Sequence, residues 1–385
     1  MLLENKTVAI IGGGPGGLTL ARLLQQKGIS VKVYERDVNR TVRVQGATLD
    51  LHFESGLKAL EAAGLLEVFK TAYRPDNDRY RVVDKNGTIY FDDHDKESTG
   101  KFGDEWFRPE IDRGPLREIL LDSLEKDTVV WDSYILSLSR EDNGWMILLE
   151  NGKMEFADIV IGADGANSKI RKYVTVIEPV YSGITFLVTN IPCAETNTPK
   201  LFELIKGGKI SALGGSKAIF LSTRGDGSLD IYISFGADQE WYKKEFPRLK
   251  GNRQLSEWFK RQYEGWDKIW LEIFYYKEAE FIPRPLFGMP TYLSWETRSD
   301  ITLIGDAAHV LPPNGEGVNA AMLDALHLAE NLTDERYSDL QLAISQFEKE
   351  MLARFQRDAA DTYDMNEWIY SDQGLQKMVE LMKGL

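Results

Sequence analysis

The sequence has a single cysteine, Cys193, among its 385 residues. One thiol cannot form an internal disulfide, and with four histidines and no cysteine-rich cluster a zinc site is not expected. No apolar run approaches the length that spans a bilayer, and the start MLLENKTVAII lacks the basic and apolar segments of a secretory signal. We therefore expect a cytoplasmic protein without a membrane segment, in which Cys193 is a buried small apolar residue.

Positive charge is also scarce, since 46 Lys and Arg residues face 60 Asp and Glu residues and the formal net charge is −14. This balance argues against nucleic acid or an anionic membrane as the main partner. The sequence shows no Ser-His-Asp or paired-carboxylate arrangement, so no catalytic side chain is predicted. His309 is predicted to be structural, and His52 and His94 are expected at the surface.

The most informative stretch spans residues 7–35, which follow the pattern strand, glycine-rich turn, helix, strand. Gly12, Gly14 and Gly17 form a G-x-G-x-x-G motif, in which they permit a tight turn, close approach of a pyrophosphate, and packing of the helix on the sheet. The free N–H groups at the helix start favour phosphate. Glu35 ends the second strand, where a carboxylate can accept hydrogen bonds from ribose hydroxyls. The stretch predicts a dinucleotide site but not which dinucleotide.

Two further turns of this kind occur later in the chain. Asp164-Gly165 follows an apolar strand and precedes a predicted helix that carries Arg171. Gly305-Asp306 follows another apolar strand and leads through two prolines into a predicted helix. An acid at a strand end can bind a ribose or ribityl hydroxyl, and the following helix start can bind a pyrophosphate or the electron-rich edge of a ring. Three such turns in one chain indicate an extended cofactor site.

The length suggests two domains or one α/β domain with an insertion. A hairpin is predicted at 80–93, and a helix at 110–126 capped by Asp112, with Arg113 and Arg117 one turn apart. Strand-like runs dominate the block 178–287, which reads as an inserted sheet domain. Further helices are expected at 56–69, 318–332, 340–368 and 374–383.

The ordered motifs resemble those of the class A, single-component flavoprotein monooxygenases with the para-hydroxybenzoate hydroxylase fold. Within that family the chain looks most like the tetracycline-inactivating enzymes, on the stretches VAIIGGGPGGLTLARLLQQKGISVKVYERD, GATLDLH, EIDRGPLREILLDSLE, VIGADGANSKIRKYV and IGDAAHVLPP. The resemblance implies an α/β fold, with a Rossmann-like FAD-binding domain, an inserted mixed β-sheet substrate domain and a long C-terminal helix. The expected bounds are 1–75, 101–177 and 288–335 for the FAD-binding domain, 76–100 and 178–287 for the substrate domain, and 336–385 for the helical segment.

The resemblance also implies which residues hold the cofactors. Glu35 and Arg36 would bind the adenosine end of FAD, Arg43 would serve NADPH, and Arg117 would assist its neighbour Arg113. The other residues implied at the FAD site are Gly12, Gly14, Gly17, Asp50, Asp164, Gly305, Asp306, Pro313, Gly317, Val318 and Asn319.

The resemblance implies a definite reaction. NADPH, bound transiently and without a domain of its own, reduces FAD; reduced flavin and O₂ form a C4a-hydroperoxide, which passes one oxygen atom to an aromatic or polycyclic substrate. A tetracycline is one candidate substrate, and a monomer is expected.

Two departures from the family pattern concern the ring end of the cofactor and the substrate. Gly315-Glu316-Gly317 stands where many members have Gly-Gln-Gly, in a loop about one residue short, and the extra negative charge is expected to alter the flavin environment. In addition, the candidate pocket positions Val188, Lys209 and Asp230 are not the polar types expected of a tetracycline enzyme.

Three alternatives remain open on the sequence. A simple NAD(P)-dependent dehydrogenase would leave the second and third turns unexplained. A flavin-dependent reductase that saturates isoprenoid double bonds would share all three motifs. A non-catalytic protein on the same fold would usually lose the glycines or the acid, which this chain keeps.

Overall fold

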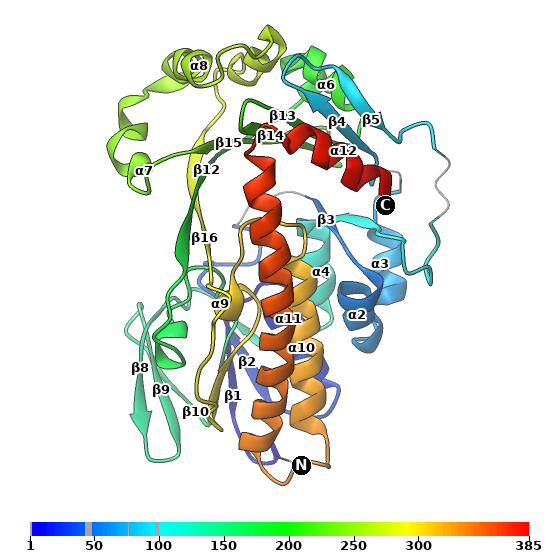
Figure 1. Cartoon of the computed structure of the whole chain (residues 1–385). Helices are drawn as coiled ribbons and strands as arrows, with labels where there is room; N and C mark the ends of the chain where they lie inside the picture. Colours follow the sequence, from blue (N-terminus) through cyan, green and yellow to red (C-terminus); the bar gives the residue numbers. More distant parts are fainter. Residues whose placement is uncertain (1, 43–47, 76, 97–99, 385) are drawn as a thin grey trace.

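The computed structural model describes residues 2–42, 48–75, 77–96 and 100–384. Its lower half is built on a five-stranded sheet with the order β17-β11-β1-β2-β7, in which all neighbours are parallel (Figure 1). Most of these short apolar strands are fully buried, as expected for a parallel sheet covered on both faces. The strands are β1 (Val8–Ile11), β2 (Val31–Tyr34), β7 (Val129–Val130), β11 (Ile159–Gly162) and β17 (Ile301–Leu303).

Helices and two small sheets surround this parallel sheet. The helix that follows β1 packs against a later helix of the chain, and both contribute buried residues to the same core as the sheet. The elements are α1 (Pro15–Gln25), η1 (Phe53–Leu57), α2 (Lys58–Ala62), α3 (Leu66–Ala72), α4 (Arg113–Asp122), α9 (Asp306–His309) and α10 (Gly317–Thr333). The antiparallel sheets are β3 (Thr48–Asp50) with β6 (Glu110–Asp112), and β8 (Ile135–Glu141), β9 (Gly144–Leu149) and β10 (Met154–Ala157).

The upper half is a seven-stranded mixed sheet with the order β16-β12-β15-β14-β13-β4-β5. Its one parallel pair joins β4 to β13, whereas the other pairs are antiparallel. The strands are β4 (Tyr80–Asp84), β5 (Ile89–Asp92), β12 (Val180–Ile191), β13 (Lys209–Gly214), β14 (Lys217–Thr223), β15 (Leu229–Gly236) and β16 (Ile282–Gly288). A core of aliphatic and aromatic side chains joins this sheet to α5 (Ala194–Asn197), α6 (Pro199–Ile205), α8 (Gly251–Gln262) and η4 (Lys268–Phe274), with α7 (Trp241–Lys244) and η3 (Phe246–Arg248) beside it.

A long helix, α11 (Leu340–Ile369), runs beside α10 from the lower half toward the upper sheet (Figure 1). It leads into α12 (Gly374–Gly384), which packs on β4, β5 and β13 through Met378 and its neighbours. The expected α/β class, the mixed-sheet insertion and the long C-terminal helix are all present. Among the described residues, no helix combines the length and the apolar character needed to cross a membrane.

The second turn does not lead into a helix as predicted. After Asp164 the chain forms loops and only a single 3-10 turn, η2 (Arg171–Tyr173). The Asp164 carboxylate accepts hydrogen bonds from Ser168 Oγ at 2.6 Å and Lys169 N at 2.6 Å, and these bonds hold the loop in a non-helical form.

Four smaller expectations are also wrong. The helix predicted at 56–69 is broken by Gly64, which adopts φ +72° while Leu65 N bonds to Leu60 O, as in a Schellman ending. Asp112 is the N-cap of α4 but makes no capping hydrogen bond, because its carboxylate instead accepts from Arg74 and Gly225. Cys193 is exposed, since it begins a turn at the end of β12 with φ +47°. His52 and His94 are largely covered and paired with carboxylates.

Candidate functional site

The glycine turn after β1 is as tight as its sequence predicts. Gly12 has φ +111°, and a Cβ there would lie 2.4 Å from Ala163 O. A Cβ on Gly17 would lie 2.1 Å from Gly12 O, so the start of α1 can pack this closely only with glycine. Apart from its two chain neighbours, none of the described residues has an atom within 4 Å of the Cβ position of Gly14, which faces open space. Of the three motif glycines, Gly14 therefore has free space beside it, at the N-terminal end of α1.

That open space belongs to a large cavity of about 1740 Å³. It is lined by Gly13 and Gly14 of the glycine turn and by Phe186 and Tyr232 of the seven-stranded sheet. Cavities for a single drug-sized ligand measure roughly 300–1,000 Å³. The cavity therefore has space for a dinucleotide and a second molecule together.

The predicted cofactor residues divide into two groups around this cavity. Those on its wall are Gly14, Arg36, Asp50, Arg113, Arg117, Asp306, Pro313, Gly317 and Val318. Those behind the wall, which shape it without lining it, are Gly12, Gly17, Glu35, Asp164, Gly305 and Asn319. Arg43 lies outside the described residues.

The wall fits FAD in its chemistry. Open backbone at Gly14 beside the start of α1 suits a pyrophosphate, and Arg36 and Arg113 add positive charge along the same cavity. Gly317 begins α10, and no atom other than Asp306 Oδ1, at 3.8 Å, lies within 4 Å of its Cβ position. A second helix start is thus open toward the cavity, where it can face the electron-rich edge of a ring.

Glu35 and Arg117 hold the loop that follows β2. The buried Glu35 carboxylate accepts hydrogen bonds from Gly13 N at 2.6 Å and Asp37 N at 3.0 Å. Arg117 donates to Arg40 O at 2.8 Å and pairs with Asp37 at 3.2 Å. Glu35 and Arg117, both predicted to bind the cofactor, therefore also hold the backbone next to the cavity in place.

Arg171 connects the second turn to the third. Its guanidinium donates to Ala307 O at 2.8 Å, Ala166 O at 3.0 Å and Asp306 O at 2.6 Å. The side chain is buried and does not line the cavity. Arg171 therefore fixes the backbone of Asp306, whose carboxylate opens toward the cavity.

His309 is held in a buried charge network, which agrees with its predicted structural role. Its Nε2 lies 2.7 Å from Asp324 Oδ2, which also accepts from Gly305 N at 2.8 Å, and Arg354 binds the other oxygen of Asp324. Burial lowers the pKa of His309, but the charge and hydrogen bond of Asp324 outweigh it and the net shift is upward. Asp324 and Arg354 could not be predicted as partners of His309, because they lie on two separate helices, α10 and α11.

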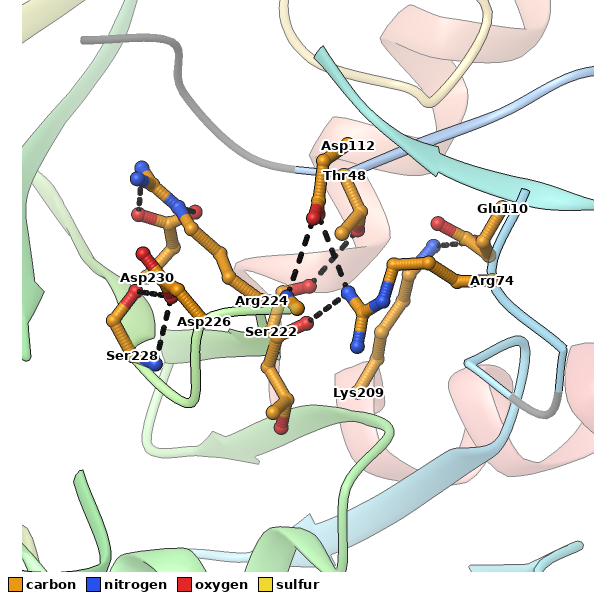
Figure 2. A network of polar contacts seen from close by, with 12 residues as sticks. Thr48, Arg74, Glu110, Asp112, Lys209, Ser222, Arg224, Asp226, Ser228 and Asp230 are labelled. Carbon is orange, nitrogen blue, oxygen red and sulfur yellow. Dashed lines mark hydrogen bonds and ion pairs between the residues drawn. The ribbon is translucent and has the colours of Figure 1, made fainter. Parts of the chain in front are cut away.

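The sheet side of the cavity combines aromatic rings with charged pairs. Phe186 lies 6.0 Å from Phe220 and 5.9 Å from Tyr232, measured between ring centroids. Lys209 pairs with Glu110, and Arg224 pairs with Asp230 (Figure 2). All seven residues line the cavity, including Lys209 and Asp230, two of the substrate positions considered from sequence; the third, Val188, lines it too.

A polar network joins this sheet to the β3–β6 sheet (Figure 2). Arg74 donates to Thr223 O at 2.9 Å and to Asp112 at 3.3 Å, and the hydroxyl oxygens of Thr48 and Ser222 lie 3.1 Å apart.

Phe186, Phe220 and Tyr232 were not predicted as site residues from the sequence. The usable signal was the alternation of side chains along each strand, which places every second residue on the cavity face.

Comparison with known proteins finds relatives of the chain in both sequence and structure. The FAD binding domain family profile matches residues 5–100 and 275–338. The chain is 30% identical over 376 residues to the monooxygenase penA of Penicillium thymicola, covering 84% of each protein. The crystal structure of HpxO from Klebsiella pneumoniae with FAD and uric acid superposes with a TM-score of 0.75 at 18% identity, over 100% of this chain and 94% of that one. The tetracycline destructase Tet(55) gives 0.74 at 19% identity, over 100% and 96%.

The two solved structures confirm the fold. The relative from Penicillium is similar in sequence over 84% of its own length. Together with the glycine turn, the three ordered motifs and the two-part cavity, these comparisons identify the family. The chain belongs to the FAD-dependent monooxygenases.

Proposed function

We propose that this monooxygenase uses NAD(P)H and O₂ to hydroxylate an aromatic or polycyclic small molecule. The observation that carries the proposal is the continuity of the cavity from the glycine turn at Gly14 to the aromatic face of the seven-stranded sheet. FAD bound along the first part would accept hydride from NAD(P)H and activate O₂ for transfer of one oxygen atom. A substrate on the sheet face would then lie at the ring end of the cofactor.

The cofactor residues proposed are those implied by the sequence. Gly14, Arg36, Arg113, Asp306 and Gly317 would contact FAD from the cavity wall, and the buried members of the set would hold these groups in place. The second and third turns, which Arg171 connects, support a single extended dinucleotide rather than a short nucleotide. NAD(P)H would approach transiently, as the resemblance implies.

The sheet face favours a flat substrate with a polar edge. Phe186, Phe220 and Tyr232 offer ring faces and edges on which a planar molecule can stack. Lys209 adds an ammonium group on the same wall, where it can bind a phenolic or enolic oxygen. We propose that residues 76–100 and 178–287 form the substrate-binding domain, and that a tetracycline is one candidate substrate, since the fold neighbours include tetracycline destructases and an enzyme solved with uric acid.

A substrate panel tests the proposal. FAD-loaded protein would be mixed with NADPH or NADH and a set of flat aromatic compounds that includes tetracycline and uric acid. We expect one compound to accelerate NAD(P)H oxidation and to gain one oxygen atom, about 16 mass units. A product that gains two hydrogens and no oxygen would instead identify a reductase of the same fold.

A matched pair of variants locates the substrate. Lys209→Met removes the ammonium group from the cavity wall and should raise KM at least tenfold, which corresponds to about 1.4 kcal/mol of binding. Lys206→Met, at an exposed ion pair with Asp95 outside the cavity, should leave KM unchanged. Equal KM values for both variants would place the substrate elsewhere.

A further inference from the structure

Glu316 occupies the N-cap position of α10, directly before Gly317, and lines the cavity. Its backbone N–H donates to Asn314 Oδ1 at 2.9 Å, and Asn314 in turn binds Thr362 of α11 at 2.8 Å. The carboxylate is therefore fixed at a helix start that is open to the cavity. This is the position at which many family members are expected to carry the neutral glutamine.

His52 lies against this carboxylate. Its Nδ1 is 3.2 Å from Glu316 Oε2, and its Nε2 is 3.0 Å from Asp50 Oδ2. The His52 side chain is 15% exposed and that of Glu316 is 42% exposed, so the contact is shielded from water on the imidazole side. An imidazole placed between two carboxylates has a hydrogen-bond acceptor at each ring nitrogen, and only the imidazolium can donate to both.

The backbone around His52 is equally well held. Asn319, in the first turn of α10, donates to Asp50 O at 2.9 Å and accepts from His52 N at 3.0 Å. Asn319 is fully buried, and Gly56 packs so closely on it that a Cβ there would lie 2.6 Å from Asn319 Oδ1. The segment 50–52 and the start of α10 therefore form one connected unit, with His52 as its central positive charge.

We propose that His52 is a positioning residue that neutralises Glu316, so that the start of α10 keeps its favourable field toward the reduced ring of the bound flavin. The proposal rests on the proposed FAD site. A carboxylate without a positive partner at this helix start would cancel part of the favourable electrostatic field of the helix N-terminus. It would also disfavour the added negative charge of a reduced flavin, because like charges repel each other. His52 thus offsets the negative charge that Glu316 adds in place of the uncharged side chain expected at this position, while Asp50 binds the other ring nitrogen.

The reduction potential of the bound flavin tests this role through a double-mutant cycle. His52→Gln should make the potential more negative by about 30 mV, a tenfold change for a two-electron couple. Glu316→Gln should not lower it, and the double variant should return to the value of Glu316→Gln. A potential in His52→Gln equal to that of the wild type would overturn the proposal, as would a double variant as negative as His52→Gln.

A second measurement needs neither bound FAD nor a stable His52 variant. In the FAD-free protein, NMR titration of His52 should give a pKa that falls when Glu316 becomes Gln and stays unchanged when the exposed Glu54 becomes Gln. An unchanged pKa in Glu316→Gln would show that the charge pair does not exist. Failure of the wild-type protein to bind FAD, with this pair intact, would refute the proposed function rather than the pairing.

Discussion

Arg171 illustrates how far a single residue could be understood from the sequence. Its place after Asp164-Gly165 predicted that it lies on a helix. In the structure the guanidinium binds the carbonyl oxygens of Ala166, Asp306 and Ala307. Two of these acceptors are more than 130 residues away in the chain, and local sequence carries no information about them. The positive charge of this residue was evident from the sequence, whereas its local conformation and its partners were not.

Asp324 is the residue whose charge should matter most for stability near the site. Asp324→Asn keeps the side-chain shape but removes the negative charge facing His309 and Arg354. We expect the free energy of unfolding to fall by about 3 kcal/mol, because loss of one partner leaves buried charges unpaired. Urea unfolding followed by circular dichroism would measure the change.

Asp361, exposed on α11, provides the control for this prediction. Asp361→Asn should change the free energy of unfolding by no more than about 0.5 kcal/mol. Similar losses in both variants would mean that the buried network contributes nothing specific.

His52 should also make stability depend on pH. Burial lowers its pKa, but hydrogen bonds and charges from Asp50 and Glu316 raise it to about 9 overall. Since this folded-state pKa exceeds the ordinary value of about 6.5, the stabilisation is fully present below about pH 6.5 and is lost as the pH rises through about 9. The difference in unfolding free energy between wild type and His52→Gln should therefore be largest near pH 6 and should shrink by pH 10. A difference independent of pH would contradict the charged bridge.

At the scale of elements, two glycines at the start of α1 allow effects on folding and on cofactor binding to be measured separately. Gly17→Ala should cost about 2 kcal/mol of stability, because its Cβ would overlap Gly12 O. Gly14→Ala meets open space at φ −80°, so the protein should remain folded with a change below about 0.5 kcal/mol. The added methyl group occupies the proposed pyrophosphate position, and FAD affinity should fall at least tenfold, about 1.4 kcal/mol. Wild-type FAD affinity in Gly14→Ala would exclude this turn as the pyrophosphate site.

The last helix, α12, contributes to both the core and the cavity. Met378 is 5% exposed and packs against the seven-stranded sheet, so Met378→Ala should lower the free energy of unfolding by about 2 kcal/mol. Leu381, on the same helix, is 43% exposed and lines the cavity. Leu381→Ala should leave stability nearly unchanged and alter KM for the substrate. Met378 lines the cavity as well, so the finding that would exclude the cavity wall at α12 from substrate binding is an unchanged KM in both variants.

Elements with strong local signals were predictable, and those that depend on distant partners were not. The buried run of β1, the glycine turn and the long apolar stripe of α11 all follow from residues within a few positions of one another. Gly64, by contrast, ends α2 although the apolar spacing continues across it. Cys193 is exposed because β12 ends at Ile191 and the chain turns after Pro192, and no local pattern showed that this turn lies at the surface.

For the whole molecule, the cavity depends on how two sheets meet. The parallel pairing of Tyr80 with Lys209 brings strands together that lie far apart in the sequence. Lys209 reaches Glu110 on β6, and the two-stranded β3–β6 sheet continues into the segment that holds His52. Periodicity predicted each strand but could not predict this pairing, which places the charged pairs beside the proposed ring end of FAD.

The most direct test of the account follows oxygen into the product. FAD-loaded protein, NADPH and the most stimulating substrate of the panel would be incubated under dioxygen labelled with oxygen-18, and the product would be measured by mass spectrometry. We expect the product to carry a single labelled oxygen atom and the other atom to leave as water. A product without labelled oxygen, formed while NADPH is consumed, would contradict it.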